Sequence, residues 1–221
     1  MSGYIIYHPK RNREVFDGTT VHYDNNKGNQ DPYVWNRQFL HTYCHMTQMT
    51  PQEGQINFWV SGDTFPNFSQ LFCDLVFVVQ SKSYWADSNH IERKDPLVDS
   101  TAAFNDHYGW AMHQHGFKRR RRFTLKANGE RSFQPQTVDG GLLDIVSALE
   151  DVGISLDVLR TKLRAGFNSR PMRLSDNEVT GLKEWMETNA PRKLVGAYLE
   201  AIRRKNPQLA SKLPDGESPR C

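Results

Sequence analysis

The sequence predicts an α+β fold. A β-rich part, for which a small barrel is one arrangement, covers residues 1–139, a helical part covers 140–206, and a flexible tail covers 207–221. Before residue 140, apolar residues alternate or form short runs of strand length, such as Leu75–Val79. After it they recur at helical spacing between capping Ser and terminating Gly residues.

Elements of the first part follow from these short apolar runs and from turn residues. The run 73–79 is apolar almost throughout, which predicts a strand buried on both faces. Asn128-Gly129 predicts a hairpin turn into 131–133. A helix is expected at 35–46, where apolar residues fall at helical spacing. Further strands are expected at 4–7, 20–23, 56–60 and 119–126.

Four helices are expected in the second part, at 142–152, 156–165, 175–189 and 191–204. Ser155 is an N-cap, Ser175 and Glu178 form a capping box, and Pro191 suits a first helical turn. The apolar faces of these helices favour packing on the first part. Docking to a protein partner is the alternative.

Composition excludes several classes of protein. Aromatic residues make up 11% of the 221, which argues against a disordered chain. The longest apolar run has strand length, and the first residues lack a signal-peptide pattern, so we expect no membrane partner and a cytoplasmic location. Three cysteines predict no disulfide framework.

The most informative feature is a basic run. Residues 118–131 contain seven Lys and Arg against one acid, a local charge of +6, whereas residues 1–116 carry −4. A phosphate backbone is the commonest partner for such a segment, because each neutralised phosphate releases counterions. A solvated charge run without function is the alternative. The expected nucleic-acid-binding residues are Lys118, Arg119, Arg120, Arg121, Arg122, Lys126 and Arg131.

Histidines close to this run are the first candidates for catalysis. His107, His113 and His115 lie within twelve residues of Arg119, and His113 and His115 would share one face of a strand. Three roles fit these histidines: a structural role, ligation of a metal ion, or contact with phosphate and proton transfer during RNA chemistry. His41 and His45 would share a helix face, but the sequence lacks the Glu of zinc-binding helices.

A second catalytic pattern resembles restriction-type nucleases. These enzymes place an Asp on one strand and an acid-x-Lys on the next, which holds a divalent ion. Asp74 followed by Gln80-Ser81-Lys82 imitates this pattern, and Asp63 has better spacing. Gln80 brings no charge to an ion, and Asp74 and Lys82 belong to one strand. The alternative is that both flank a buried strand.

The strand that begins at Asp74, the Tyr84-Trp85 pair and the later basic strand resemble the PUA/EVE-like superfamily. Its members include prokaryotic nucleotide modification associated proteins. The resemblance covers residues 56–135 and implies an aromatic pocket for a flipped or modified base, in a modification or defence setting. Trp59, Trp85 and Trp110 would line that pocket.

The leading hypothesis is therefore a nucleic-acid-binding protein that needs no cofactor. The first alternative is a nuclease dependent on histidine or on a divalent metal. The second alternative is a subunit that docks to a larger nucleoprotein complex through its helical part.

Overall fold

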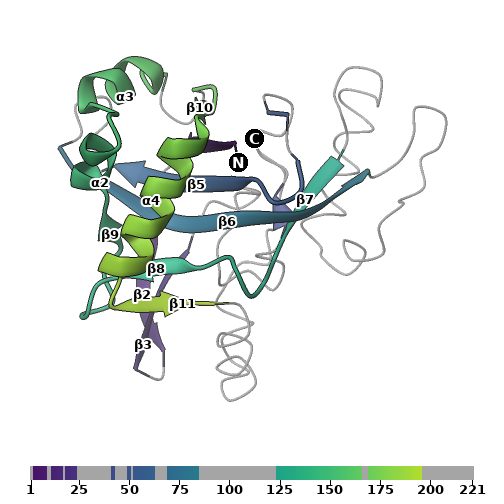
Figure 1. Ribbon diagram of the computed structural model, residues 1–221. Coiled ribbons are helices and arrows are strands. Elements are labelled where there is room, and N and C mark those ends of the chain that lie inside the picture. Colours follow the sequence, from purple (N-terminus) through teal and green to yellow (C-terminus); the bar gives the residue numbers. More distant parts are fainter. Residues whose placement is uncertain are drawn as a thin grey trace.

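The computed structural model confirms the α+β fold class. It describes residues 2–8, 11–16, 18–23, 41–42, 49–50, 52–62, 69–84, 123–165 and 169–195. All elements below belong to these residues. A mixed β-sheet forms the centre of the fold, and helices cover one of its faces (Figure 1).

The sheet has seven strands, of which six follow one path in the order β10-β1-β5-β6-β7-β4. β1 and β5 are parallel, and the other pairs are antiparallel. A seventh strand, β9, pairs with β6. The strands are β1 (Gly3–Tyr7), β4 (His41–Thr42), β5 (Ile56–Gly62), β6 (Leu71–Tyr84), β7 (Phe123–Ala127), β9 (Leu143–Asp144) and β10 (Met172–Leu174).

Two small ribbons lie beside this sheet. β2 (Asn12–Phe16) and β3 (Thr19–Tyr23) form a hairpin, and Gly18 in its turn has a φ of 71°, which favours glycine. β8 (Gln134–Gln136) pairs with β11 (Arg192–Leu194). Reciprocal hydrogen bonds between Val76 and Phe133, of 2.8 and 3.1 Å, join the start of β8 to β6.

The helices are α2 (Val146–Asp151), α3 (Leu156–Lys162) and α4 (Asp176–Asn189). Two predicted caps are confirmed, because Ser155 caps α3 and Ser175 forms a capping box with Glu178 at the start of α4. α4 crosses one face of the sheet in front of β5 and β6 (Figure 1). None of the helices in the described ranges is long and apolar enough to cross a membrane.

Strand alternation divides the central sheet into two buried faces. Ile5, Phe58 and Val76 belong to the core shared with the helices. Ile6 and Trp59, which follow Ile5 and Phe58 in the chain, are buried outside that core, on the opposite face. From Cys73 to Val79 every residue is at most 2% exposed, which confirms that this strand is buried on both faces.

Three predicted helices differ from the structure, each because short strands pair over long sequence distances. Residues 142–144 pair with β8 and β6, so the first helix begins only at Val146. After Pro191, residues 192–194 form β11 instead of a helix. In the expected helix 35–46, residues 41–42 form β4, which pairs with β7. The other residues of these last two predicted helices, except 191 and 195, lie outside the described part.

Candidate functional site

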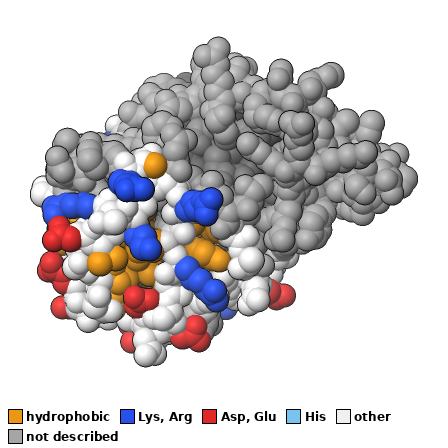
Figure 2. Space-filling model, turned by 90° about the horizontal axis from the view of Figure 1, so that it is seen from above, with side chains coloured by type: hydrophobic (Ala, Val, Ile, Leu, Met, Phe, Trp, Pro, Cys, Tyr) orange, Lys and Arg blue, Asp and Glu red, His pale blue; other side chains and the backbone are white. Residues whose placement is uncertain are grey.

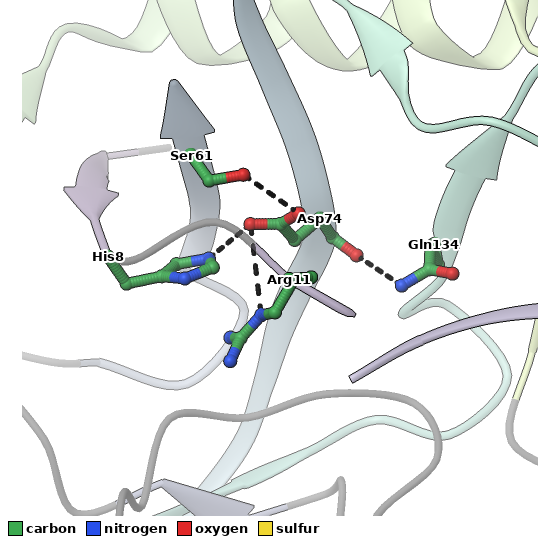
Figure 3. Close-up of polar contacts among 5 residues, drawn as sticks. All are labelled: His8, Arg11, Ser61, Asp74 and Gln134. Carbon is green, nitrogen blue, oxygen red and sulfur yellow. Dashed lines mark hydrogen bonds and ion pairs between the residues drawn. The ribbon is translucent and has the colours of Figure 1, made fainter. Parts of the chain in front are cut away.

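A buried polar network lies where β1, β5 and β6 meet (Figure 3). His8 follows β1 and extends its parallel pairing, because its N–H donates to the Val60 carbonyl at 3.0 Å. Ser61 lies near the end of β5, and Asp74 lies near the start of β6. Because β5 and β6 are antiparallel, all three reach the same end of the sheet. Their exposure is at most 1%.

Asp74 is the centre of this network. Its Oδ1 accepts a hydrogen bond from the Ser61 hydroxyl at 3.2 Å. Its Oδ2 contacts the Nε2 of His8 and lies 4.0 Å from the Nε of Arg11, whose side chain is fully buried. The Nε2 of Gln134 donates to the Asp74 carbonyl at 3.0 Å. One carboxylate therefore holds an imidazole, a guanidinium and a hydroxyl together (Figure 3).

A β-bulge aims Asp74 at these partners. Trp59 pairs with Leu75 and Val60 pairs with Cys73, so Asp74 is an extra residue on β6. Cys73 and Val76 both belong to the core under the helices, although strict alternation would place them on opposite faces. The bulge thus turns Asp74 away from the apolar core. Bulges that re-aim one side chain in this way are frequent next to functional sites.

The network continues into the β2–β3 hairpin. The Nε2 of Gln136 donates to the Gln134 Oε1 at 2.9 Å and to the Thr20 carbonyl at 3.0 Å. The imidazole Nε2–H of His22 donates to the Gly140 carbonyl at 2.8 Å. Arg11, which directly precedes β2, contacts Asp74. The hairpin is therefore joined to the sheet through Arg11, and to β8 and Gly140 through Thr20 and His22 of β3.

Trp59 packs against the imidazole of His8, with ring centroids 5.9 Å apart and the planes inclined by 44°. Its exposure is 0%, so it offers no surface on which a base could stack. Trp59, which was expected to line a base pocket, instead contacts the buried network on the sheet face opposite the helices.

Asp74 and Lys82 occupy distant positions on β6. Lys82 is eight residues further along β6, about 26 Å at ~3.3 Å per residue. Its backbone pairs with Leu125 of β7, whereas Asp74 lies at the bulge beside Trp59. Among the nuclease candidates, Asp74 belongs to the buried network. Asp63 lies outside the described residues.

The structure describes only some of the other expected site residues. Arg131 is exposed in the turn that follows Asn128, whose Oδ1 accepts the Arg131 N–H at 3.0 Å. Lys126 belongs to β7, and His41 belongs to β4 instead of a helix. Outside the described residues lie His45, Trp85, His107, Trp110, His113, His115, Lys118, Arg119, Arg120, Arg121 and Arg122.

Sequence reasoning missed His8, Arg11 and Ser61. A signal exists for the first two, because His8 directly follows a wholly apolar strand, Tyr4–Tyr7, and Arg11 comes three residues after His8. Polar residues at the ends of parallel strands meet at one edge of a sheet. The sequence does not reveal that β1 and β5 are parallel, and that pairing is what brings His8 beside Ser61.

Around Asp74, the described part of the network offers acid–base groups but only two typical metal ligands, His8 and Asp74 itself. Within the described ranges, no group of three or more His, Cys, Asp or Glu residues is arranged to hold a metal ion. Cys73 adjoins Asp74 but faces the apolar core, and burial raises the pKa of its thiol well above 9.0. A protonated, fully buried thiol is a poor nucleophile.

Fold and network together define an α+β protein whose mixed sheet holds a buried carboxylate, imidazole and guanidinium. No protein-family model, no curated protein and no solved structure matches the chain. Functional conclusions therefore rest on the residues themselves.

The first prediction concerns pH and His22. Burial lowers the pKa of His22 from its ordinary 6.5, and the hydrogen bond to Gly140 only partly opposes this shift. The unfolded chain therefore binds a proton at His22 more readily than the folded chain. The free energy of unfolding should then fall as the pH drops below about 6.5, by at most about 1.4 kcal/mol per pH unit. Urea unfolding at pH 7 and pH 5 should show a smaller loss for His22→Gln, which keeps an N–H donor. An equal loss in both proteins would contradict the prediction.

Proposed function

We propose that the protein binds nucleic acid through the basic run, defined as Lys118–Lys126 together with Arg131. The observation that carries the proposal is the charge of +6 over residues 118–131, in a chain whose first 116 residues carry −4. Arginines at this density repel one another unless anions neutralise them. Phosphates spaced along a backbone supply those anions, and release of their counterions drives binding.

The described residues around this segment support an anchored binding strand. Leu125 and Ala127 of β7 are fully buried, which fixes the end of the basic run to the sheet. Arg131 is exposed in the turn that follows β7. Chain connectivity joins Arg122 to Phe123, which pairs with Tyr84, ten residues along β6 from Asp74. At ~3.3 Å per residue this is about 33 Å, so the point at which residues 118–122 join β7 is far from Asp74.

Binding should disappear when this charge is reversed. For Arg120→Glu/Arg122→Glu we expect at least a hundredfold loss of affinity for a 24-base-pair duplex, measured by fluorescence anisotropy in DNA and in RNA form. The wild-type affinity should fall steeply with salt, with a slope of about −0.9 per phosphate contacted. Arg192→Glu, which reverses a half-buried cation on β11, is the control and should bind almost normally. A flat salt response would refute nucleic-acid binding.

A further inference from the structure

A second group of basic residues lies around α3 and β10. Residues 158–175 contain five Lys and Arg and no acid. Arg160 pairs with Asp157 of the preceding turn at 3.0 Å. The other four are exposed and form no ion pair with any described residue. We call these four the α3–β10 surface: Lys162, Arg164, Arg170 and Arg173.

The fold gathers these cations at one end of the molecule. Leu159 and Leu163, both fully buried, anchor α3 in the core. After the helix, the Ala165 N–H donates to the Ser169 Oγ at 3.1 Å, which closes the loop flanked by Arg164 and Arg170. Figure 2, which views the end of the molecule that carries α3 and β10, shows Lys and Arg side chains gathered around hydrophobic ones.

Arg173 extends the surface onto the edge of the sheet. Its neighbours Met172 and Leu174 pack on the core under the helices, so strand alternation directs Arg173 to the other side. β10 ends the strand path and pairs with β1, so its second edge is not covered by a strand among the described residues. The α3–β10 surface therefore wraps from the end of a helix around a sheet edge.

Two structural roles explain part of this pattern. A cation near the end of a helix interacts favourably with its dipole, which suits Lys162. A charged residue on an edge strand discourages pairing with another chain, which suits Arg173. Neither role explains Arg164 and Arg170, or the absence of any acid over eighteen residues. An anionic partner explains all four cations together.

We propose that the α3–β10 surface is a second contact for the phosphates of the nucleic acid held by the basic run. This inference rests on the proposed function. Four strand spacings separate β10 from β7, about 19 Å at ~4.8 Å each. Arg173 pairs with Tyr4, and the β1–β5 and β5–β6 pairings place Tyr4 level with Phe77 of β6. Phe77 lies seven residues before Tyr84. Those residues add about 23 Å along the sheet.

The two offsets place Arg173 about 30 Å from Phe123, where the basic run joins β7. Successive phosphates of one duplex strand lie about 3.4 Å apart along the axis, so about nine base pairs are needed to reach both surfaces. A shorter duplex can contact only one of them. A loss of affinity that depends on the length of the duplex therefore indicates that one nucleic acid contacts both surfaces.

The test compares Arg164→Glu/Arg170→Glu with wild type on a hairpin with a six-base-pair stem and on a 24-base-pair duplex, in DNA and in RNA form. We expect about a tenfold or greater loss on the long duplex, a salt slope shallower by about 1.8, and an unchanged affinity for the short stem. Circular dichroism and the melting temperature should stay unchanged, since both side chains are exposed.

Other outcomes separate the two proposals. If Arg120→Glu/Arg122→Glu abolishes binding while Arg164→Glu/Arg170→Glu has no effect on either probe, the second surface is refuted and the proposed function stands. Equal losses on both probes would refute the spanning geometry. A wild type that binds no probe refutes both proposals. Loss of binding to anionic phosphatidylserine vesicles, with duplex binding intact, would assign the surface to lipid and overturn the inference.

Discussion

Replacing Asp74 with Ala should lower the free energy of unfolding by about 3–5 kcal/mol. The carboxylate is 1% exposed and is the partner of the buried guanidinium of Arg11, of His8 and of the Ser61 hydroxyl. Its removal leaves a buried positive charge without its counterion, and that desolvation cost accounts for most of the loss. Urea unfolding followed by tryptophan fluorescence and circular dichroism measures it.

Two further variants separate charge from packing. Asp74→Leu/Arg11→Met removes both charges, so it should recover much of the stability that Asp74→Ala loses. Asp157→Ala breaks the exposed pair with Arg160 and should change the free energy of unfolding by no more than about 0.5 kcal/mol. A loss below about 1 kcal/mol for Asp74→Ala would mean that the carboxylate does not compensate Arg11.

Gly3→Ala should be the most damaging single-methyl change in the described sheet, at about 3 kcal/mol. A Cβ at Gly3 would lie 2.1 Å from the carbonyl oxygen of Ile56 and 2.8 Å from Cγ2 of Val179. The carbonyl belongs to the backbone of β5, the parallel partner of β1, so relief requires the two strands to separate. Overpacking against a fixed backbone lies at the upper end of the usual 1–3 kcal/mol range. Chemical denaturation measures the loss.

Gly181→Ala is the matched control, because its Cβ would lie 2.6 Å from a side-chain atom, Cγ1 of Val152, and not from backbone. Alanine also favours the interior of α4 by about 1 kcal/mol over glycine, which offsets the contact. Val179→Ala combined with Gly3→Ala should recover only a small part of the loss. Equal stabilities for Gly3→Ala and Gly181→Ala would show that β1 and β5 separate easily.

The fold could be predicted from the sequence where local patterns decide it. The apolar run at 73–79 and the capping box at Ser175 are local signals, and the structure confirms both as β6 and the start of α4. β9, β10 and β11 are only two or three residues long, too short for periodicity to be visible. Their partners lie far away in the sequence, which explains why helices were expected in place of β9 and β11.

The candidate site was harder to predict than the fold. Asp74 was identified, but with Lys82 as its partner, because adjacency in the sequence suggested a shared ion. The bulge and the parallel β1–β5 pair instead bring it to His8 and Arg11. Neither feature leaves a local pattern in the sequence. The α3–β10 surface was also missed, because its cations are interleaved with helical and apolar residues and form no continuous run.

The position of β1 between β5 and β10 has a consequence for biosynthesis. Ile5 pairs with Phe58 on one side and with Met172 on the other. A ribosome that adds about 5–20 residues per second needs about 10–30 s to make the second partner after the first strand. During that time Tyr4–Tyr7, an apolar segment of high β-propensity, has a bare edge that can recruit other nascent chains. Yield in the cell should therefore depend on chaperones that shield this first strand until translation has passed β10.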